Sequence, residues 1–150
     1  MLVRKAKKDD MPGVFKLIQE LAAFQEQASA IMITVADLIR DGFTDRQEFQ
    51  CLVAEDYNEI IGIAFYSFGY STWLGRTIKL DDLIVREDQR GKGIGFKLYD
   101  ELVRIAKIEN VRRITWFVYK WNKKAIEFYK KIGATAENDL LIMQVADPLA

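Results

Sequence analysis

The sequence contains no histidine among its 150 residues. This absence excludes Ser-His-Asp and Cys-His catalysis, and it excludes any metal site that depends on histidine ligands. A catalytic proton transfer in this protein must therefore use a carboxylate, a tyrosine, a lysine, a cysteine or ordered water.

Cysteine is almost as scarce, since Cys51 stands alone. A single cysteine excludes an internal disulfide framework and leaves no ligands for a cysteine-rich zinc site, so we expect no metal. Cys51 begins the apolar run 51–54, a setting typical of a small buried hydrophobic residue rather than of a nucleophile.

The sequence also lacks a surplus of charge and a long apolar run. Lys plus Arg and Asp plus Glu number 22 each, so the formal net charge is zero and we expect no nucleic-acid partner. No apolar stretch approaches membrane length and the start does not look like a signal peptide, so we expect a cytoplasmic protein without membrane association. Half of the residues are hydrophobic, which predicts one folded domain over residues 1–150.

The most informative stretch is a glycine-rich loop between a predicted strand and a predicted helix. The apolar run 80–85, with two acids inside it, leads into Arg-Gly-Lys-Gly-Ile-Gly at 90–95 and then into a helical pattern. Alternate glycines allow backbone N–H groups to point at one spot, and the positive end of the following helix points at the same spot. Arg90 and Lys92 add cationic side chains. The stretch predicts an anion cradle suited to a pyrophosphate.

Three phosphate-binding patterns compete for this loop, and spacing separates them. A Walker loop needs Ser or Thr after Gly-Lys, and a dinucleotide fingerprint needs G-x-G-x-x-G; neither spacing is present. The third pattern, [QR]-x-x-G-x-[GA], is matched by Arg90, Gly93 and Gly95. It is the acetyl-CoA signature of the GNAT superfamily of N-acetyltransferases. A glycine loop that only reverses the chain is the alternative.

The remaining chain alternates predicted strands and helices, which indicates a mixed α/β sheet. Pro12 lies in the first turn of a helix that Asp9 or Asp10 caps, and Thr34 with Asp37 resembles a capping box. The predicted strands are 2–7, 51–54, 60–70, 80–85, 114–119 and 140–145. The first predicted helix follows the Asp9 or Asp10 cap and carries an apolar face over residues 14–21, with Phe24 in the loop after it. The other predicted helices are 34–42, 93–108 and 125–132, the last capped by Asn122 and closed by Gly133. We expect the aromatic residues Trp116, Phe117 and Tyr119 to be part of the core.

Several further motifs occur in one order along the chain: DGF at 41–43, CLVAE at 51–55, YSTWLGRTIKLDD at 70–82 and WNKKAIEFYKKIGA at 121–134. Together with the glycine loop, they make the chain similar to the spermidine/spermine (diamine) and thialysine N-acetyltransferase branch of the GNAT superfamily. The resemblance implies the GNAT fold, a mixed and mostly antiparallel central sheet flanked by about four helices. It also implies acetyl-CoA as cosubstrate, a small-molecule amine as acceptor, and a homodimer.

The resemblance also implies roles for particular residues. Tyr129 would protonate the departing CoA thiolate, and Asp81, where the family has glutamate, would act as general base through water. The implied cofactor-binding residues are Leu83, Ile84, Val85, Arg90, Gly91, Lys92, Gly93, Ile94, Gly95, Asn122 and Tyr129. The implied substrate-binding residues are Trp73, Asp81, Asp82 and Glu26.

The chemistry of amine acetylation gives an independent reason to consider the Asp81–Asp82 pair. An alkyl ammonium with a pKa of ~10.4 is only about 0.1% neutral near neutral pH, a cost of roughly 4 kcal/mol, so a base must remove a proton. Neighbouring carboxylates raise each other's pKa, but alternation along a strand predicts that only one of the two faces the substrate.

Two classes of function stay open at this point. The sequence favours an acetyl-CoA:amine N-acetyltransferase, with thialysine or lysine ahead of polyamines because stretch 25–30 keeps a single acid, Glu26. The alternative is a catalytically weak CoA-binding regulatory or interaction module, since Asp81 is shorter than the family's glutamate.

Overall fold

The computed structural model describes residues 1–149, which form two compact units, residues 1–117 and residues 118–149. The first contains β1 (Leu2–Lys5), α1 (Met11–Phe24), α2 (Val35–Gly42), β2 (Gln50–Asp56), β3 (Glu59–Ser71), β4 (Gly75–Val85), α3 (Ile94–Ile108) and β5 (Ile114–Thr115), with 3-10 turns at Lys8–Asp10, Ala28–Ala30 and Glu87–Gln89. The second contains α4 (Lys123–Lys131).

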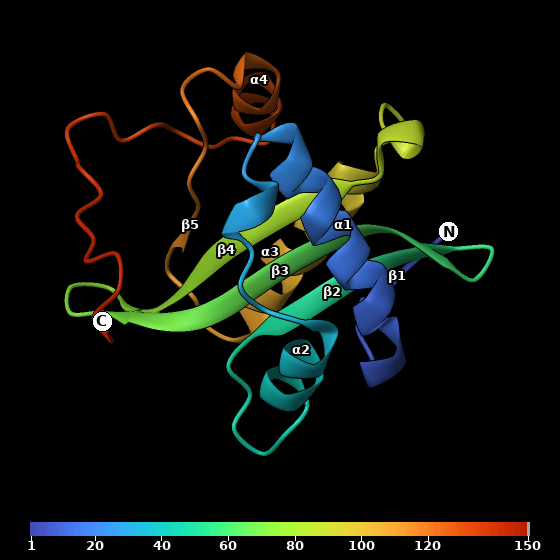
Figure 1. Ribbon diagram of the computed structural model, residues 1–150. Coiled ribbons are helices and arrows are strands. Elements are labelled where there is room, and N and C mark those ends of the chain that lie inside the picture. Colours follow the sequence, from blue (N-terminus) through green and yellow to red (C-terminus); the bar gives the residue numbers. More distant parts are fainter. Residues whose placement is uncertain (150) are drawn as a thin grey trace. The chain divides into compact units, whose positions relative to one another are not determined.

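The strands of the first unit form one sheet in the order β1-β2-β3-β4-β5 (Figure 1). The pairs β1–β2, β2–β3 and β3–β4 are antiparallel, whereas β4 and β5 are parallel. Short turns join β2 to β3 and β3 to β4, a longer segment with α1 and α2 joins β1 to β2, and the helical crossover through α3 provides the parallel connection. The predicted mixed and mostly antiparallel sheet is therefore present.

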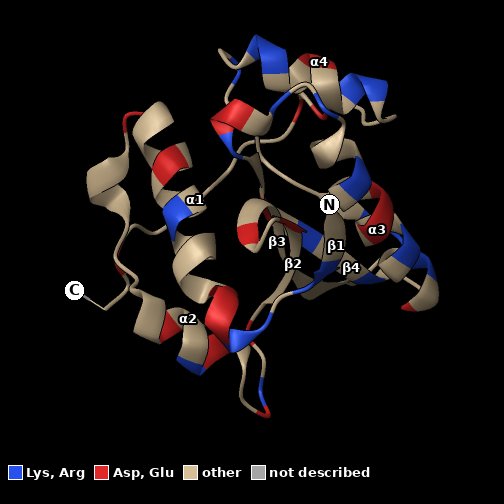
Figure 2. Ribbon diagram, turned by 90° about the vertical axis from the view of Figure 1, so that its right-hand side faces the viewer, with Lys and Arg blue, Asp and Glu red and all other residues tan. Residues whose placement is uncertain are grey.

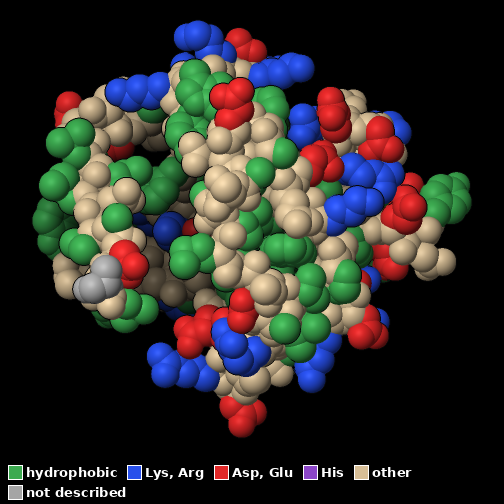
Figure 3. Space-filling view, in the orientation of Figure 1, with side chains coloured by type: hydrophobic (Ala, Val, Ile, Leu, Met, Phe, Trp, Pro, Cys, Tyr) green, Lys and Arg blue, Asp and Glu red, His purple; other side chains and the backbone are tan. Residues whose placement is uncertain are grey.

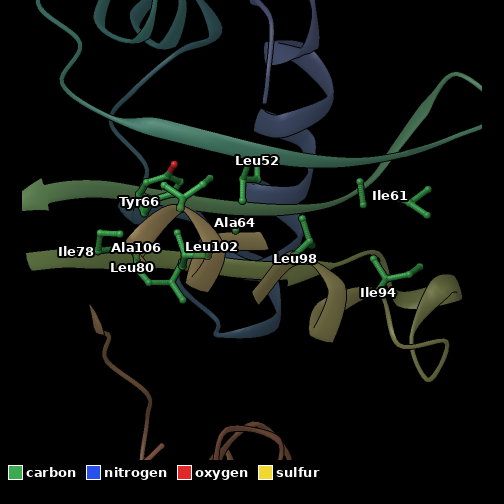
Figure 4. Packing of buried hydrophobic residues seen from close by; sticks show 12 residues of the cluster. Leu52, Ile61, Ala64, Tyr66, Ile78, Leu80, Ile94, Leu98, Leu102 and Ala106 are labelled. Atoms are coloured by element: carbon green, nitrogen blue, oxygen red, sulfur yellow. The ribbon is translucent and has the colours of Figure 1, made fainter. Parts of the chain in front are cut away.

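Helices cover both faces of this sheet, and each face has its own apolar cluster. The first cluster joins α3 to β3 and β4 through fully buried side chains such as Leu98, Leu102 and Leu80 (Figure 4). The second joins α1 and α2 to the opposite face, with Met11, Leu17 and Leu38 among its members. Because alternate strand residues point to opposite faces, membership of a cluster reports the face to which a side chain belongs.

The predicted capping residues behave differently at α1 and α2, the two helices that cover the same face of the sheet. Thr34 and Asp37 form the expected capping box, with the Asp37 N–H donating to Thr34 Oγ1 at 3.2 Å and the Thr34 N–H donating to Asp37 Oδ2 at 2.8 Å. Asp10 precedes α1, but its side chain makes no capping bond. It instead accepts hydrogen bonds from Arg4 Nη1 at 2.7 Å and from the Lys7 N–H, also at 2.7 Å.

The predicted strand 114–119 is much shorter in the structure. β5 pairs with β4 only through Ile114 with Ile78 and Thr115 with Lys79. Trp116 packs against the first cluster as expected, but 64% of Phe117 is exposed, so its assignment to the core is wrong. The sequence has the alternation of a strand here, but β-structure requires a partner, and pairing ends after Thr115.

In the second unit, Asn122 caps α4 as predicted, accepting the Ala125 N–H at 3.3 Å, and Gly133 follows the helix at φ +94°. Residues 140–145 do not form the predicted strand, and Leu141 and Met143 are each 85% exposed. Tyr119 is also exposed rather than in a core. A strand without a neighbour leaves its backbone groups unpaired, and residues 118–149 provide no other strand.

Charged residues are distributed without a dominant sign. Basic and acidic segments both occur on α1, α2 and α3 in Figure 2, whereas basic segments predominate on α4. The two signs are intermingled over the face in Figure 3. Of the described helices, none has the length and apolar character needed to cross a membrane.

Candidate active site

The open edge of β4 is the first feature of the candidate site. β5 covers β4 only at Ile78 and Lys79, although β4 continues for six residues to Val85 and pairs with β3 throughout this length. Beyond Lys79 the backbone groups on the other side of β4 have no strand partner among residues 1–149. An exposed edge of this kind can accept an extended ligand as an added strand, as predicted for Leu83, Ile84 and Val85.

A β-bulge lies at the beginning of this open edge. Phe65 pairs with Asp82 and Tyr66 with Leu80, so Asp81 is an extra residue on β4. Leu80 and Leu83 both belong to the α3-face cluster, so the bulge interrupts the normal alternation. The expectation that Asp81 and Asp82 point to opposite faces is therefore wrong.

Both acids lie on the α1/α2 face of the sheet. Asp82 is registered with Phe65, which packs in the cluster on that face. Asp81 Oδ1 lies 3.5 Å from Lys79 Nζ, and Lys79 is registered with Ser67, two residues beyond Phe65 on the same face. The bulge thus brings two carboxylates together on one surface.

The two acids have different surroundings. Asp82 is half-buried in a row that runs across three strands, Cys51–Phe65–Asp82. Desolvation in this apolar row, followed by the negative charge of Asp81, raises the pKa of Asp82 to about 6. Asp81 is more exposed and has the Lys79 ammonium beside it. Lys79 in turn lies 5.1 Å from the centre of the Phe117 ring.

Sequence reasoning missed Lys79. Its spacing from Asp81 could have indicated a contact, because residues two apart on a strand share a face. A basic residue in a strand is not by itself a sign of a functional site.

The second feature is the glycine loop, which has the backbone geometry of an anion cradle. Gly91 and Gly93 have φ values of +79° and +78°, and no heavy atom of the described chain outside the neighbouring residues lies within 4 Å of a Cβ built at either position. Gly93 is the N-cap of α3 and provides no side-chain cap. The first N–H groups of α3 therefore lack both intrahelical acceptors and a capping side chain, at the end of a loop whose glycines have open space beside them.

The loop's cations make local contacts in this structure. Arg90 Nε donates to the Val85 carbonyl at 3.0 Å, and Lys92 Nζ donates to Gln89 Oε1 at 3.1 Å. Glu20 of α1 accepts the Glu87 N–H at 3.1 Å, and its carboxylate lies 4.0 Å from Arg90 Nη2. No local sequence signal connects Glu20 with the loop, since 67 residues separate it from Glu87.

Other predicted residues lie away from the acid pair or in the second unit. Trp73 is 91% exposed at the β3–β4 turn. Gly75, just after this turn, is six residues from Asp81 along β4, roughly 20 Å at 3.3 Å per residue, so the single chain does not bring Trp73 to the acids.

Glu26 is exposed just after α1, at φ +57°. Asn122 and Tyr129 belong to the second unit, where the Tyr129 ring lies edge-on to Phe128 at 5.8 Å.

Together, the open strand edge, the bulge acids and the uncapped helix terminus define a class of protein with an arrangement suited to an elongated anionic ligand beside a pair of carboxylates. Comparison with known proteins identifies this class. The model of the acetyltransferase (GNAT) family matches residues 15–134.

Two curated relatives and a solved structure extend the comparison. The chain is 34% identical to a thialysine N-epsilon-acetyltransferase of Bos taurus, over 89% of this chain and 84% of that protein. It is 35% identical to the spermidine/spermine N(1)-acetyltransferase-like protein 1 of Homo sapiens, over 88% of this chain and 20% of the longer protein. An integron cassette protein of Vibrio cholerae superposes with a TM-score of 0.79 at 23% identity, covering 98% of this chain and 93% of that one.

The chain belongs to the acetyltransferase (GNAT) family and is an N-acetyltransferase. The GNAT fold expected from the sequence is confirmed.

Proposed function

We propose that this protein transfers the acetyl group of acetyl-CoA to a primary amine of a small molecule by direct attack. The observation that carries the proposal is the combination of two features on β4. Its open edge offers a place for an extended thioester ligand, and its bulge presents two carboxylates at the beginning of that edge. One strand thereby supports both the acyl donor and the amine.

The donor site follows from the residues around β4 and α3. The backbone of Leu83, Ile84 and Val85 would bond to the pantetheine arm, and Asn122 would contact the cofactor. The pyrophosphate would lie against Arg90, Gly91, Lys92, Gly93, Ile94 and Gly95. The open space at the glycines and the uncapped end of α3 support this fit. Acetyl-CoA supplies the activated acetyl thioester.

The acid pair suits the amine because its carboxylates can attract an ammonium group and then accept its proton. Removing that proton is essential, since the ammonium form dominates by about a thousandfold at neutral pH. Tyr129, by resemblance, gives its hydroxyl proton to the departing thiolate. A phenol with a pKa near 10 is protonated at working pH, as this role needs.

We further propose that the acceptor is a short amino-acid-like amine such as thialysine or lysine, ahead of spermidine. The curated relatives named above include a thialysine N-epsilon-acetyltransferase and a spermidine/spermine N(1)-acetyltransferase-like protein, so both amines are reasonable tests. A polycation gains from several carboxylates along its path, whereas the 25–30 stretch after α1 offers only Glu26.

The direct test is thiol release from acetyl-CoA with a panel containing thialysine, lysine, ornithine, spermidine and spermine. We expect turnover, with a higher kcat/KM for thialysine than for spermidine. A tenfold preference for spermidine, about 1.4 kcal/mol in transition-state binding, would overturn the ranking. CoA binding by calorimetry without thiol release from any amine would instead identify a binding module without useful catalysis.

A homodimer is the proposed assembly, by resemblance to dimers whose two sites lie close to the shared interface. The exposed apolar side chains of residues 140–145 and the exposed Trp73 support self-association, because large uncovered apolar side chains are typical of interfaces. Light scattering at micromolar concentration tests this, and a monomer mass near 17.3 kDa would reject it.

A further inference from the structure

Asp82 is a half-buried carboxylate with no partner. Across residues 1–149 it accepts no hydrogen bond and forms no ion pair, although most acids on this sheet are paired, as Asp81 is with Lys79. Partial burial of this carboxylate without a protein donor raises the free energy of its ionised form. Its presence on the bulge beside the open edge therefore calls for a function.

Resting on the function proposed above, we propose that Asp82, rather than Asp81, accepts the proton of the substrate ammonium. The bulge places both acids on the α1/α2 face, so either can reach a substrate bound there. They differ in their neighbours. Lys79 occupies one side of Asp81, whereas the Asp82 carboxylate has no cation or donor beside it. Asp81 and Lys79 are then positioning residues that keep a negative charge next to Asp82.

Titratable groups on the elements that form this face are held neutral or engaged in other contacts. From β2, Cys51 contributes a thiol whose pKa is raised by burial, so it stays neutral. From α2, Asp37 is bonded by Thr34 and Arg40. From α1, Glu20 is engaged by the Glu87 N–H. The pKa of Asp82, about 6, is closer to working pH than that of an ordinary aspartate at ~3.9, which makes it a stronger base that is still ionised at pH 7.4.

The proposed transfer balances in protons and bonds. Asp82 takes one proton from the ammonium and later releases it to solvent. The free amine nitrogen forms the C–N bond at the thioester carbonyl carbon, and the C–S bond breaks. Tyr129 gives its proton to the sulfur, and the second amine proton leaves to solvent, from which Tyr129 is reprotonated. The sum is one acetamide, one thiol and one proton released.

Matched Asp82→Asn and Asp81→Asn variants test the assignment through the pH profile of kcat/KM with thialysine and with spermidine. The wild-type rate should fall below pH 6 as Asp82 becomes protonated. Asp82→Asn should lose this acidic limb and at least a hundredfold in rate at pH 7.4. Asp81→Asn should keep the limb but move it to lower pH, because the Asp81 charge contributes to the raised pKa of Asp82.

Stability separates a catalytic loss from a folding defect. The folded-state pKa of Asp82 lies above its unfolded value, so ionising it costs folding free energy, and this cost is present above pH 6. Asp82→Asn removes the charge, so its Tm at pH 8 should equal or exceed that of the wild type. Asp45→Asn, in an exposed loop, is the control for both measurements.

The possible outcomes are distinct. An Asp82→Asn variant that keeps its acidic limb and its rate within threefold, while Asp81→Asn loses both, overturns the inference and leaves the proposed function intact. A wild-type protein that turns over no amine overturns the proposed function and this inference with it. A folded Asp82→Asn variant that has lost the limb supports the assignment.

Discussion

The carboxylate of Glu20 accepts a hydrogen bond from the backbone N–H of Glu87 at 3.1 Å, linking α1 to the turn that leads into the glycine loop. The same carboxylate lies 4.0 Å from Arg90 Nη2. Glu20 therefore has two opposing effects on an anion site. It fixes the loop backbone, but it also places a negative charge beside a cation that the anion needs.

Two substitutions at Glu20 separate these effects. Glu20→Gln keeps an acceptor for the Glu87 N–H and removes the charge, so CoA should bind as tightly as in the wild type or more tightly. Glu20→Ala removes the acceptor as well, and the lost hydrogen bond should weaken CoA binding by roughly twofold to tenfold. Calorimetric titration with CoA measures both. Equal affinities in the two variants would show that the loop does not depend on Glu20.

Gly93→Val tests the location of the pyrophosphate site. The side chain would occupy the open space at the start of α3, so CoA affinity should fall by at least tenfold. Gly75→Val is the matched control, because Gly75 has a similar φ of +87° and equally open surroundings but lies at the β3–β4 turn. Both variants should lose about 1–2 kcal/mol of stability from strain at positive φ. Unchanged CoA binding in Gly93→Val would show that the site has been misplaced.

Tyr129→Phe tests the proposed general acid. The change keeps the ring and its edge-on contact with Phe128 but removes the hydroxyl. kcat should fall by roughly tenfold or more, while acetyl-CoA affinity changes little. Tyr119→Phe, at a ring stacked on Trp121, is the control and should be near wild type. A kcat close to wild type in Tyr129→Phe would leave that residue with a structural role only.

Asp10 should make stability depend on pH. The hydrogen bond from the Arg4 side chain, and then that from the Lys7 N–H, lower the pKa of Asp10. A lowered folded-state pKa gives stability that is present above the unfolded value near 3.9 and is lost as pH falls through the folded value. Asp10→Asn should cost about 1–3 kcal/mol in urea unfolding at pH 7, and the difference should shrink at pH 3 or below. Exposed Asp9 provides the control, and an equal loss in Asp9→Asn would refute a specific role for the Arg4 contact.

Local patterns predicted the features of this protein that depend on neighbouring residues. The capping box at Thr34 and the Asn122 cap both follow from residue types within a few positions of each other. The order of the motifs indicated the GNAT fold, because the glycine loop takes its meaning from the strand before it and the helix after it. The roles proposed for Tyr129 and Asn122 come from the resemblance to the family.

Only tertiary structure decided the features that depend on pairing between distant segments. Residues 114–119 and 140–145 have strand-like composition, but a strand exists only where a partner provides hydrogen bonds, and pairing stops after Thr115. The bulge at Asp81 depends on the register between β3 and β4, which alternation along one strand cannot reveal. That register places both acids on one face and leaves Asp82 beside Phe65 in an apolar row. The packing of α1 on this face of the sheet brings Glu20 to the loop. The sequence determined which groups are available for catalysis, and the pairing of strands determined which of them meet.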